Sequence, residues 1–187
     1  MVRVPKAAEA SRETIGGALA TVYWVGAAYN PAARPGGAVD SMKAVNKSVL
    51  IWFSCEEMFA LVADVAAYPK FLPWCDRAVV LESNADGLTA EIGIAFGGIR
   101  QSFVTRNRHT PGRRITLQLV KGPFSQLEGS WDFVAVGDGS ERACRIELSL
   151  RYGFANRALA ALVGPVFDRI AATLIDAFVK RADHVYA

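Results

Sequence analysis

Apolar and polar residues alternate along most of the chain from residue 42 onward, and this predicts a series of β-strands. The clearest run is 88–96, where every second residue from Leu88 to Phe96 is apolar while Thr89 and Glu91 are polar. Other strand-like runs are 43–53, 77–82, 99–109, 115–119, 127–133 and 144–152, with Gly, Pro, Asn or Asp residues between several of them. Clean alternation indicates an antiparallel sheet with one buried face.

Two segments instead have apolar residues three and four positions apart, which is typical of amphipathic helices. Ser54 precedes Glu57 by three residues, the spacing of a capping box, and the pattern that follows predicts a helix to about Ala66. Residues 156–184 predict a long C-terminal amphipathic helix. We expect Gly164-Pro165 to kink this helix or to separate a short first segment.

This order of elements predicts an α+β fold: a strand, a helix, about six antiparallel strands and the long helix. The helix would cover the apolar face of the sheet. A strongly curved sheet of about six to seven strands wrapped around one helix cannot always fill its interior with side chains. A cavity between sheet and helix is therefore expected.

The segment Tyr68-Pro69-Lys70-Phe71-Leu72-Pro73-Trp74-Cys75 is unusually apolar for a connection between elements. Its two prolines argue against a regular helix or a central strand. Loops are usually polar because they run over the surface, so this one must be buried, line a pocket or touch a partner. Two interpretations stay open: a plug that closes the end of the sheet, or a lid that admits a lipid tail or touches a membrane.

The first forty-one residues differ from the rest in composition. Residues 15–30 carry no charge and are rich in Gly and Ala, and 30–37 has the composition of a linker. We predict that residues 1–41 are either a poorly ordered extension or upstream sequence translated from a misassigned start codon. A signal peptide is the alternative. The folded domain would then span residues 42–187.

Composition and charge are those of a globular protein with a modest positive charge. The chain has 187 residues, 52% of them apolar and 21% charged, with a net charge of +3. No acidic residue occurs between Glu91 and Glu128. Arg100, Arg106 and Arg108 in this interval are candidates for contact with phosphates of RNA or of anionic lipids. The alternative is an ordinary solvated strand face.

The sequence contains no recognisable catalytic or metal-binding motif. Cys55, Cys75 and Cys144 lack metal-ligand spacing and are interpreted as free thiols in a reducing compartment. Cys75 has no neighbouring base, and a lone turn histidine such as His109 is usually exposed and inert. We therefore predict no catalytic residue, no metal and no enzymatic activity. We also predict a cytoplasmic location, with peripheral contact at the inner membrane as a further option.

The chain resembles the coenzyme Q-binding, START-like family, which is often grouped with polyketide cyclases. The resemblance rests on residues 42–50, on the YPKFLPWC segment at 68–75, and on Gly122-Pro123-Phe124 followed by residues 127–133. It extends from Met42 to about Val185. The family includes mitochondrial coenzyme Q-binding proteins and bacterial ribosome association toxins.

The resemblance implies a helix-grip fold with a hydrophobic tunnel between sheet and helix that holds a polyprenyl quinone such as ubiquinone. Carried over by position, the tunnel residues fall on the apolar segment, the sheet and the long helix. They are Phe71, Leu72, Trp74, Phe96, Phe103, Leu117, Leu127, Trp131, Phe133, Leu148, Leu150, Val163, Phe167, Ile170 and Leu174. Lys70 departs from the acidic or neutral residue expected at its position.

Three functions follow as hypotheses. The first is non-enzymatic binding of ubiquinone in support of respiratory electron transport. The second is binding to the large ribosomal subunit, which blocks subunit association. The third, ranked last for want of a paired acid and base, is a cyclase-type enzyme. A DNA partner is not expected.

Overall fold

The computed structural model describes residues 11–15, 18–23, 42–139 and 142–187. Its strands form one antiparallel sheet in the order β1-β2-β3-β9-β8-β7-β6-β5-β4. The strand bounds are β1 Ser11–Ile15, β2 Ala18–Tyr23, β3 Lys43–Ile51, β4 Cys75–Asn84, β5 Gly87–Phe96, β6 Ile99–Thr110, β7 Arg114–Lys121, β8 Phe124–Ala135 and β9 Cys144–Phe154.

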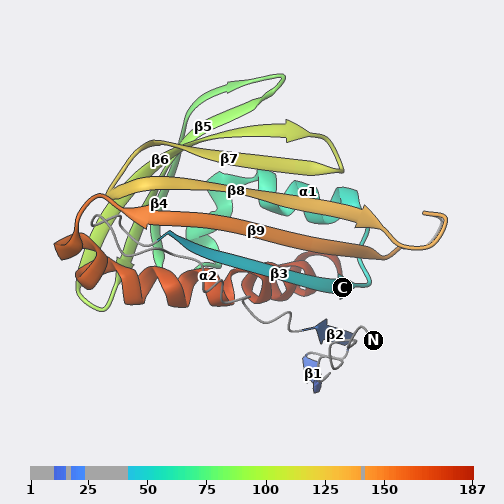
Figure 1. Cartoon of the computed structure of the whole chain (residues 1–187). Coiled ribbons are helices and arrows are strands. Elements are labelled where there is room, and N and C mark those ends of the chain that lie inside the picture. Colours follow the sequence, from blue (N-terminus) through green and yellow to red (C-terminus); the bar gives the residue numbers. More distant parts are fainter. Residues whose placement is uncertain (1–10, 16–17, 24–41, 140–141) are drawn as a thin grey trace, which may run out of the picture.

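The seven strands β3–β9 curve around the long helix α2 (Arg157–Tyr186), which lies along the concave side of the sheet (Figure 1). This is the predicted α+β arrangement of about six to seven antiparallel strands around a C-terminal helix, so the fold prediction is confirmed. Alternate residues of β9 are buried from Cys144 to Tyr152, as expected for a sheet with one covered face.

The strands β1 and β2 add a hairpin at the edge of β3, in a stretch where the sequence pattern predicted no strand. Residues 1–10, 16–17 and 24–41 lie outside the described residues. The boundary at residue 42 therefore stays a prediction.

Helix α1 (Cys55–Ala63) begins with the predicted capping box. The Ser54 hydroxyl accepts a hydrogen bond of 3.1 Å from the Glu57 N–H, and the Glu57 carboxylate accepts one of 2.8 Å from the Ser54 N–H. The helix ends three residues earlier than predicted. After Asp64 the chain tightens into the 3₁₀ helix η1 (Val65–Lys70), which accommodates Pro69. Residues 71–74 then lead directly into β4.

Of the two outcomes expected at Gly164-Pro165, a kink or the separation of a short first segment, the second is wrong, because helix α2 runs without interruption. Val163 and Phe167, on either side of the proline, are both buried, and the Phe167 ring packs against aromatic rings of the sheet, which stabilises the helix at this point. By length and hydropathy alone α2 would also pass for a membrane span. Core helices share this property, and the buried side of α2 packs in the interior of the domain.

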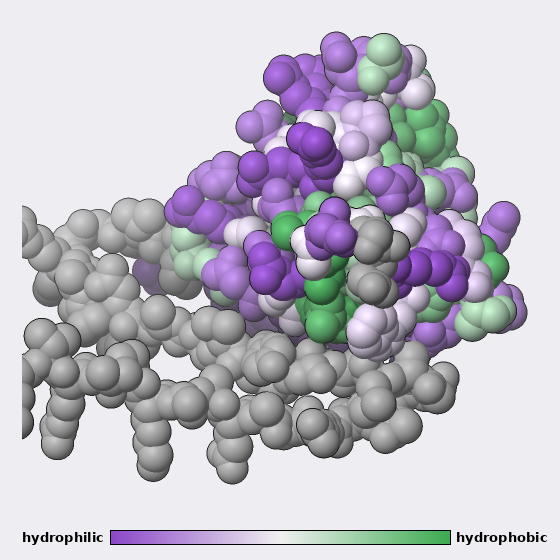
Figure 2. Space-filling view, turned by 90° about the vertical axis from the view of Figure 1, so that its right-hand side faces the viewer, coloured by the Kyte–Doolittle hydropathy of each residue, from purple (hydrophilic) through white to green (hydrophobic). Residues whose placement is uncertain are grey.

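Two clusters of buried side chains fill the space between sheet and helices. One lies around α1 and the C-terminal half of α2, and the other around η1, β5 and the N-terminal half of α2. Seen from the right-hand side of Figure 1, the surface is mostly hydrophilic with smaller hydrophobic patches (Figure 2).

Candidate functional site

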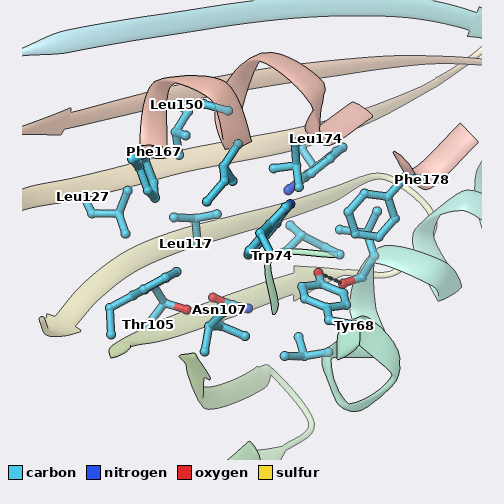
Figure 3. A pocket seen from close by; sticks show the side chains of 18 residues that line it. Tyr68, Trp74, Thr105, Asn107, Leu117, Leu127, Leu150, Phe167, Leu174 and Phe178 are labelled. Atoms are coloured by element: carbon cyan, nitrogen blue, oxygen red, sulfur yellow. Dashed lines mark hydrogen bonds between the residues drawn. The ribbon is translucent and has the colours of Figure 1, made fainter. Parts of the chain in front are cut away.

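A cavity of about 90 Å³ lies between the sheet and α2, bounded also by η1 and residue 74 (Figure 3). Curvature produces it, because β5–β9 bend away from the helix and the side chains do not fill the whole interior. The lining is mostly aliphatic and aromatic, so the cavity suits an apolar guest.

Nine of the residues predicted for the tunnel come together around this cavity. They are Trp74, Phe103, Leu117, Leu127, Trp131, Leu150, Phe167, Ile170 and Leu174. The residues come from the apolar segment, from four strands and from α2, so only the tertiary fold assembles them. Their role in ligand binding stays a prediction.

Six predicted tunnel residues do not line the cavity. Leu72, Phe133, Leu148 and Val163 are buried in the surrounding core, and Phe71 lies in a groove on the other side of Trp74. Phe96 is 38% exposed. It is the last residue of β5, next to the Gly97-Gly98 turn at the end of the strand. There the Arg169 guanidinium lies 5.6 Å from its ring centre.

Three polar side chains that were not among the predicted tunnel residues also face the cavity. Thr105 and Asn107 are adjacent inward positions of β6, and both are buried. The Asn107 Oδ1 atom has no hydrogen-bond partner, which is costly for a buried carbonyl oxygen. The Tyr68 hydroxyl donates a hydrogen bond of 2.7 Å to the Val62 carbonyl oxygen. Asn107 therefore brings an unpaired carbonyl oxygen to a mostly apolar site.

The sequence contained a signal for Thr105 and Asn107. The alternation of β6 that puts Phe103 and Thr105 on the inner face also puts Asn107 there. A polar residue at such a position is informative because buried polar groups normally have a partner. Other residues that line the cavity and were not predicted are Val62, Val65, Ile92, Ile115, Ala171 and Phe178.

The titratable groups near the site are held in their neutral forms. Burial raises the pKa of the Tyr68 hydroxyl, and it raises the pKa of the Cys75 thiol to about 11. Burial also lowers the pKa of His109, whose ring meets Phe59 edge-on at 5.6 Å. Among the described residues no group of His, Cys, Asp and Glu could hold a metal ion.

The convex face of the sheet carries charged side chains in ion pairs. Arg114 contacts Asp132 at 3.1 Å and Arg145 contacts Glu147 at 2.9 Å. The predicted patch residue Arg100 is also paired, with Asp76 at 3.2 Å. Further pairs join Arg77 to Glu91 and Arg151 to Glu128.

Arg106 and Arg108 differ from these arginines. Both are exposed on β6, and in the part of the chain that the structure describes neither has a carboxylate within salt-bridge distance. Their cross-strand neighbours are uncharged: Thr89 and Gln118 for Arg106, Gly87 and Thr116 for Arg108. Of the three predicted patch residues, these two offer free positive charge.

Comparison with known proteins shows the family. The family described as "Polyketide cyclase / dehydrase and lipid transport" matches residues 52–179. The "Ribosome association toxin RatA" of Vibrio cholerae is 40% identical over 145 residues, which cover 78% of this chain and 99% of that relative. The "Coenzyme Q-binding protein COQ10 homolog B, mitochondrial" of Xenopus laevis is 28% identical over 142 residues, 75% of this chain and 58% of that protein.

A solved structure with the same fold is the Zhui aromatase/cyclase from a Streptomyces species. It has a TM-score of 0.66 at 15% identity, covering 76% of this chain and 94% of that one. At this identity the likeness concerns the fold alone. The matched domain, the curved sheet around α2 and the relative at 40% identity together show that the chain belongs to the START-like polyketide cyclase and lipid transport family.

Proposed function

We propose that this protein associates with the ribosome and that it does so on the large subunit, blocking subunit association. The observation that carries the proposal is the 40% identity to the RatA of Vibrio cholerae, which extends over 99% of that protein. This support is stronger than that for quinone binding, where the relative is 28% identical and matched over 58% of its length.

Arg106 and Arg108 are suited to contact the phosphates of ribosomal RNA. Their guanidinium groups are exposed, side by side on one strand, and free of the ion pairs that neutralise their neighbours. An unpaired guanidinium binds phosphate oxygens with charge-assisted hydrogen bonds, often two at a time. We infer that these two residues form part of the contact.

Co-sedimentation with purified large subunits across a salt series tests the proposal. Binding should weaken steeply between about 50 and 200 mM salt, because counterions are released from the RNA on binding. Arg106→Glu with Arg108→Glu should lower the affinity by at least about tenfold. Arg145→Glu with Arg151→Glu is the matched control: it makes the same charge change on the same face, at arginines already paired with carboxylates.

Equal losses in the two double variants would show that overall charge, rather than this pair of residues, drives binding. No binding at low salt would reject the proposal.

A second candidate function is the binding of a ubiquinone-like lipid, favoured by the apolar cavity and by the COQ10 relative. Ligand pockets are typically about 300–1,000 Å³. The cavity of about 90 Å³ is smaller, so a quinone could enter only if the lining moves apart. Trp74 and α2 are the parts of the lining nearest the surface groove at residues 70–74 and 173–184.

Mass spectrometry of lipids that co-purify with the protein tests this second function. Leu117→Trp places a larger side chain in the cavity and should reduce co-purifying quinone severalfold. The exposed Val120→Trp, on the same strand but outside the lining, should not. Neither variant should alter ribosome co-sedimentation. A protein free of lipid that also ignores added quinone would reject quinone binding while leaving ribosome binding unaffected.

We further propose that the protein acts by binding rather than by catalysis, in the cytoplasm. The cavity lining contains Tyr, Trp, Thr and Asn as its polar residues, and no carboxylate or imidazole that could serve as a general acid or base. A cyclase would need such a group within reach of its substrate. Incubation with polyketide-type substrates should therefore give no turnover above the uncatalysed rate.

A further inference from the structure

We propose that the groove on the outer side of Trp74 binds the phosphate headgroups of an anionic membrane. This groove of about 620 Å³ runs between the apolar segment and the C-terminal half of α2. It is lined by Lys70, Phe71, Pro73, Trp74, Thr173, Asp176, Ala177, Lys180, Arg181 and His184, and is called the basic groove below.

The charge of the basic groove favours an anion. Lys70 and Lys180 are exposed at its rim, and Arg181 lies deeper, with its guanidinium 5.5 Å from the ring centre of Phe71. The Arg181 Nε atom is buried without a hydrogen-bond partner. Asp176 is the one carboxylate in the lining. Three cationic side chains against one anionic side chain match the charge of a phosphate group.

Apolar side chains lie beside these charges, as a lipid surface requires. Pro73 is exposed at the groove, and the Trp74 carbonyl oxygen accepts a hydrogen bond of 2.9 Å from the Ala95 N–H at the end of β5. The β5–β6 turn is thus held next to the apolar segment. It presents the exposed ring of Phe96, with the cationic Arg169 against it. Basic residues flanking exposed aromatic residues are typical of surfaces that bind anionic membranes.

The basic groove and the cavity adjoin at a single residue. Trp74 lines both, and Figure 3 shows its side chain among the cavity residues. The buried indole favours a lipid surface over RNA as the occupant, because RNA sites stack bases on exposed aromatic faces, whereas Trp74 is 9% exposed.

Flotation of the full chain with vesicles tests the proposal. One set contains phosphatidylglycerol in phosphatidylcholine, and the other contains phosphatidylcholine alone. Binding is expected to the anionic vesicles only. Lys180→Gln with Arg181→Gln should weaken binding to the anionic vesicles about 30-fold, because each basic residue near an anionic surface contributes an attraction that the double variant loses. Phe96→Ser, which changes an exposed ring, should weaken it without lowering the Tm.

The matched control is Arg106→Gln with Arg108→Gln, which removes the same charge from the convex face. Its binding to anionic vesicles should fall by less than about threefold. An equal loss in both double variants would overturn the proposal, as would equal binding to phosphatidylcholine alone. Release of the protein by millimolar inorganic phosphate would assign the groove to a soluble anion. RNA binding that disappears in the Lys180/Arg181 variant would assign it to nucleic acid. None of these outcomes depends on the Arg106/Arg108 ribosome test.

Discussion

The hydroxyl group of Tyr68 donates a hydrogen bond of 2.7 Å to the carbonyl oxygen of Val62, and both residues line the cavity. Val62 lies in the last turn of α1, where backbone carbonyls lack partners within the helix. The bond therefore joins the end of α1 to η1 and fixes the start of the apolar segment. The Tyr68 ring also packs edge-on against Phe178 of α2 at 5.4 Å.

Tyr68→Phe removes this hydrogen bond and keeps the ring. We expect the free energy of unfolding to fall by about 1 kcal/mol, because a buried carbonyl loses its partner. Urea titration followed by circular dichroism measures this change. Phe71→Leu, a change in the same segment that leaves the bond intact, separates hydrogen bonding from packing. An unchanged unfolding midpoint for Tyr68→Phe would show that water replaces the hydroxyl.

Asn107→Leu replaces the unpaired amide in the cavity by an apolar side chain of similar size. Since the Asn107 Oδ1 atom has no partner, we expect the free energy of unfolding to rise by about 1 kcal/mol. Asn107→Asp is the matched opposite, because it introduces a charge into an apolar site and should destabilise the fold.

If the ring of a bound quinone hydrogen-bonds to Asn107 in the cavity, Asn107→Leu should also retain less quinone despite its higher stability. Thermal unfolding and lipid extraction of the same preparations separate these two effects. A less stable Asn107→Leu protein would contradict the prediction.

Trp74→Ala distinguishes a plug from a lid. The indole is buried between the cavity and the basic groove, so its removal should cost about 3–5 kcal/mol. It should also open the cavity to solvent, and a short-chain ubiquinone analogue should then enter faster, as followed by stopped-flow fluorescence quenching. Trp74→Phe should retain most of the stability, and the analogue should enter it more slowly than it enters Trp74→Ala. Slower uptake by Trp74→Ala with an unchanged Tm would indicate a lid that guides the ligand instead.

Half-buried His109 should make stability depend on pH below neutrality. Burial lowers its pKa in the folded protein below the ordinary 6.5, so the unfolded chain binds its proton more readily. Its contribution to stability is complete above pH 6.5 and is lost as the pH falls through the folded pKa. We expect the Tm to drop between about pH 7.5 and pH 5 and the drop to be smaller in His109→Gln.

The exposed His184→Gln is the control for His109, and its profile should match that of the parent protein. The Glu57 carboxylate, whose pKa is lowered by Arg142, acts in a separate, more acidic window. Its stabilising effect is complete above the ordinary value of 4.5 and is lost as the pH falls through the lowered pKa. Parallel profiles for the parent protein and His109→Gln would contradict the assignment to His109.

Local patterns in the sequence predicted the elements of this fold well. The capping box of Ser54 and Glu57, the alternating strands and the long C-terminal helix each depend on interactions within a few residues. The same alternation in residues 99–109 places Thr105 on the inner face of β6. These features can be predicted because the period of the apolar residues sets which side of an element is buried.

The tertiary structure decided which residues on each element become buried, exposed or paired with a charge. Phe96 and Leu127 both follow an alternating pattern, yet Phe96, at the end of β5 beside a turn, is 38% exposed, whereas Leu127 is buried in the cavity lining. The same holds for charge. Arg100 and Arg106 lie on one strand, but among the described residues only Arg100 of these two has a carboxylate within salt-bridge distance, Asp76 of β4. Periodicity determines the face a residue occupies; long-range packing determines what that face meets.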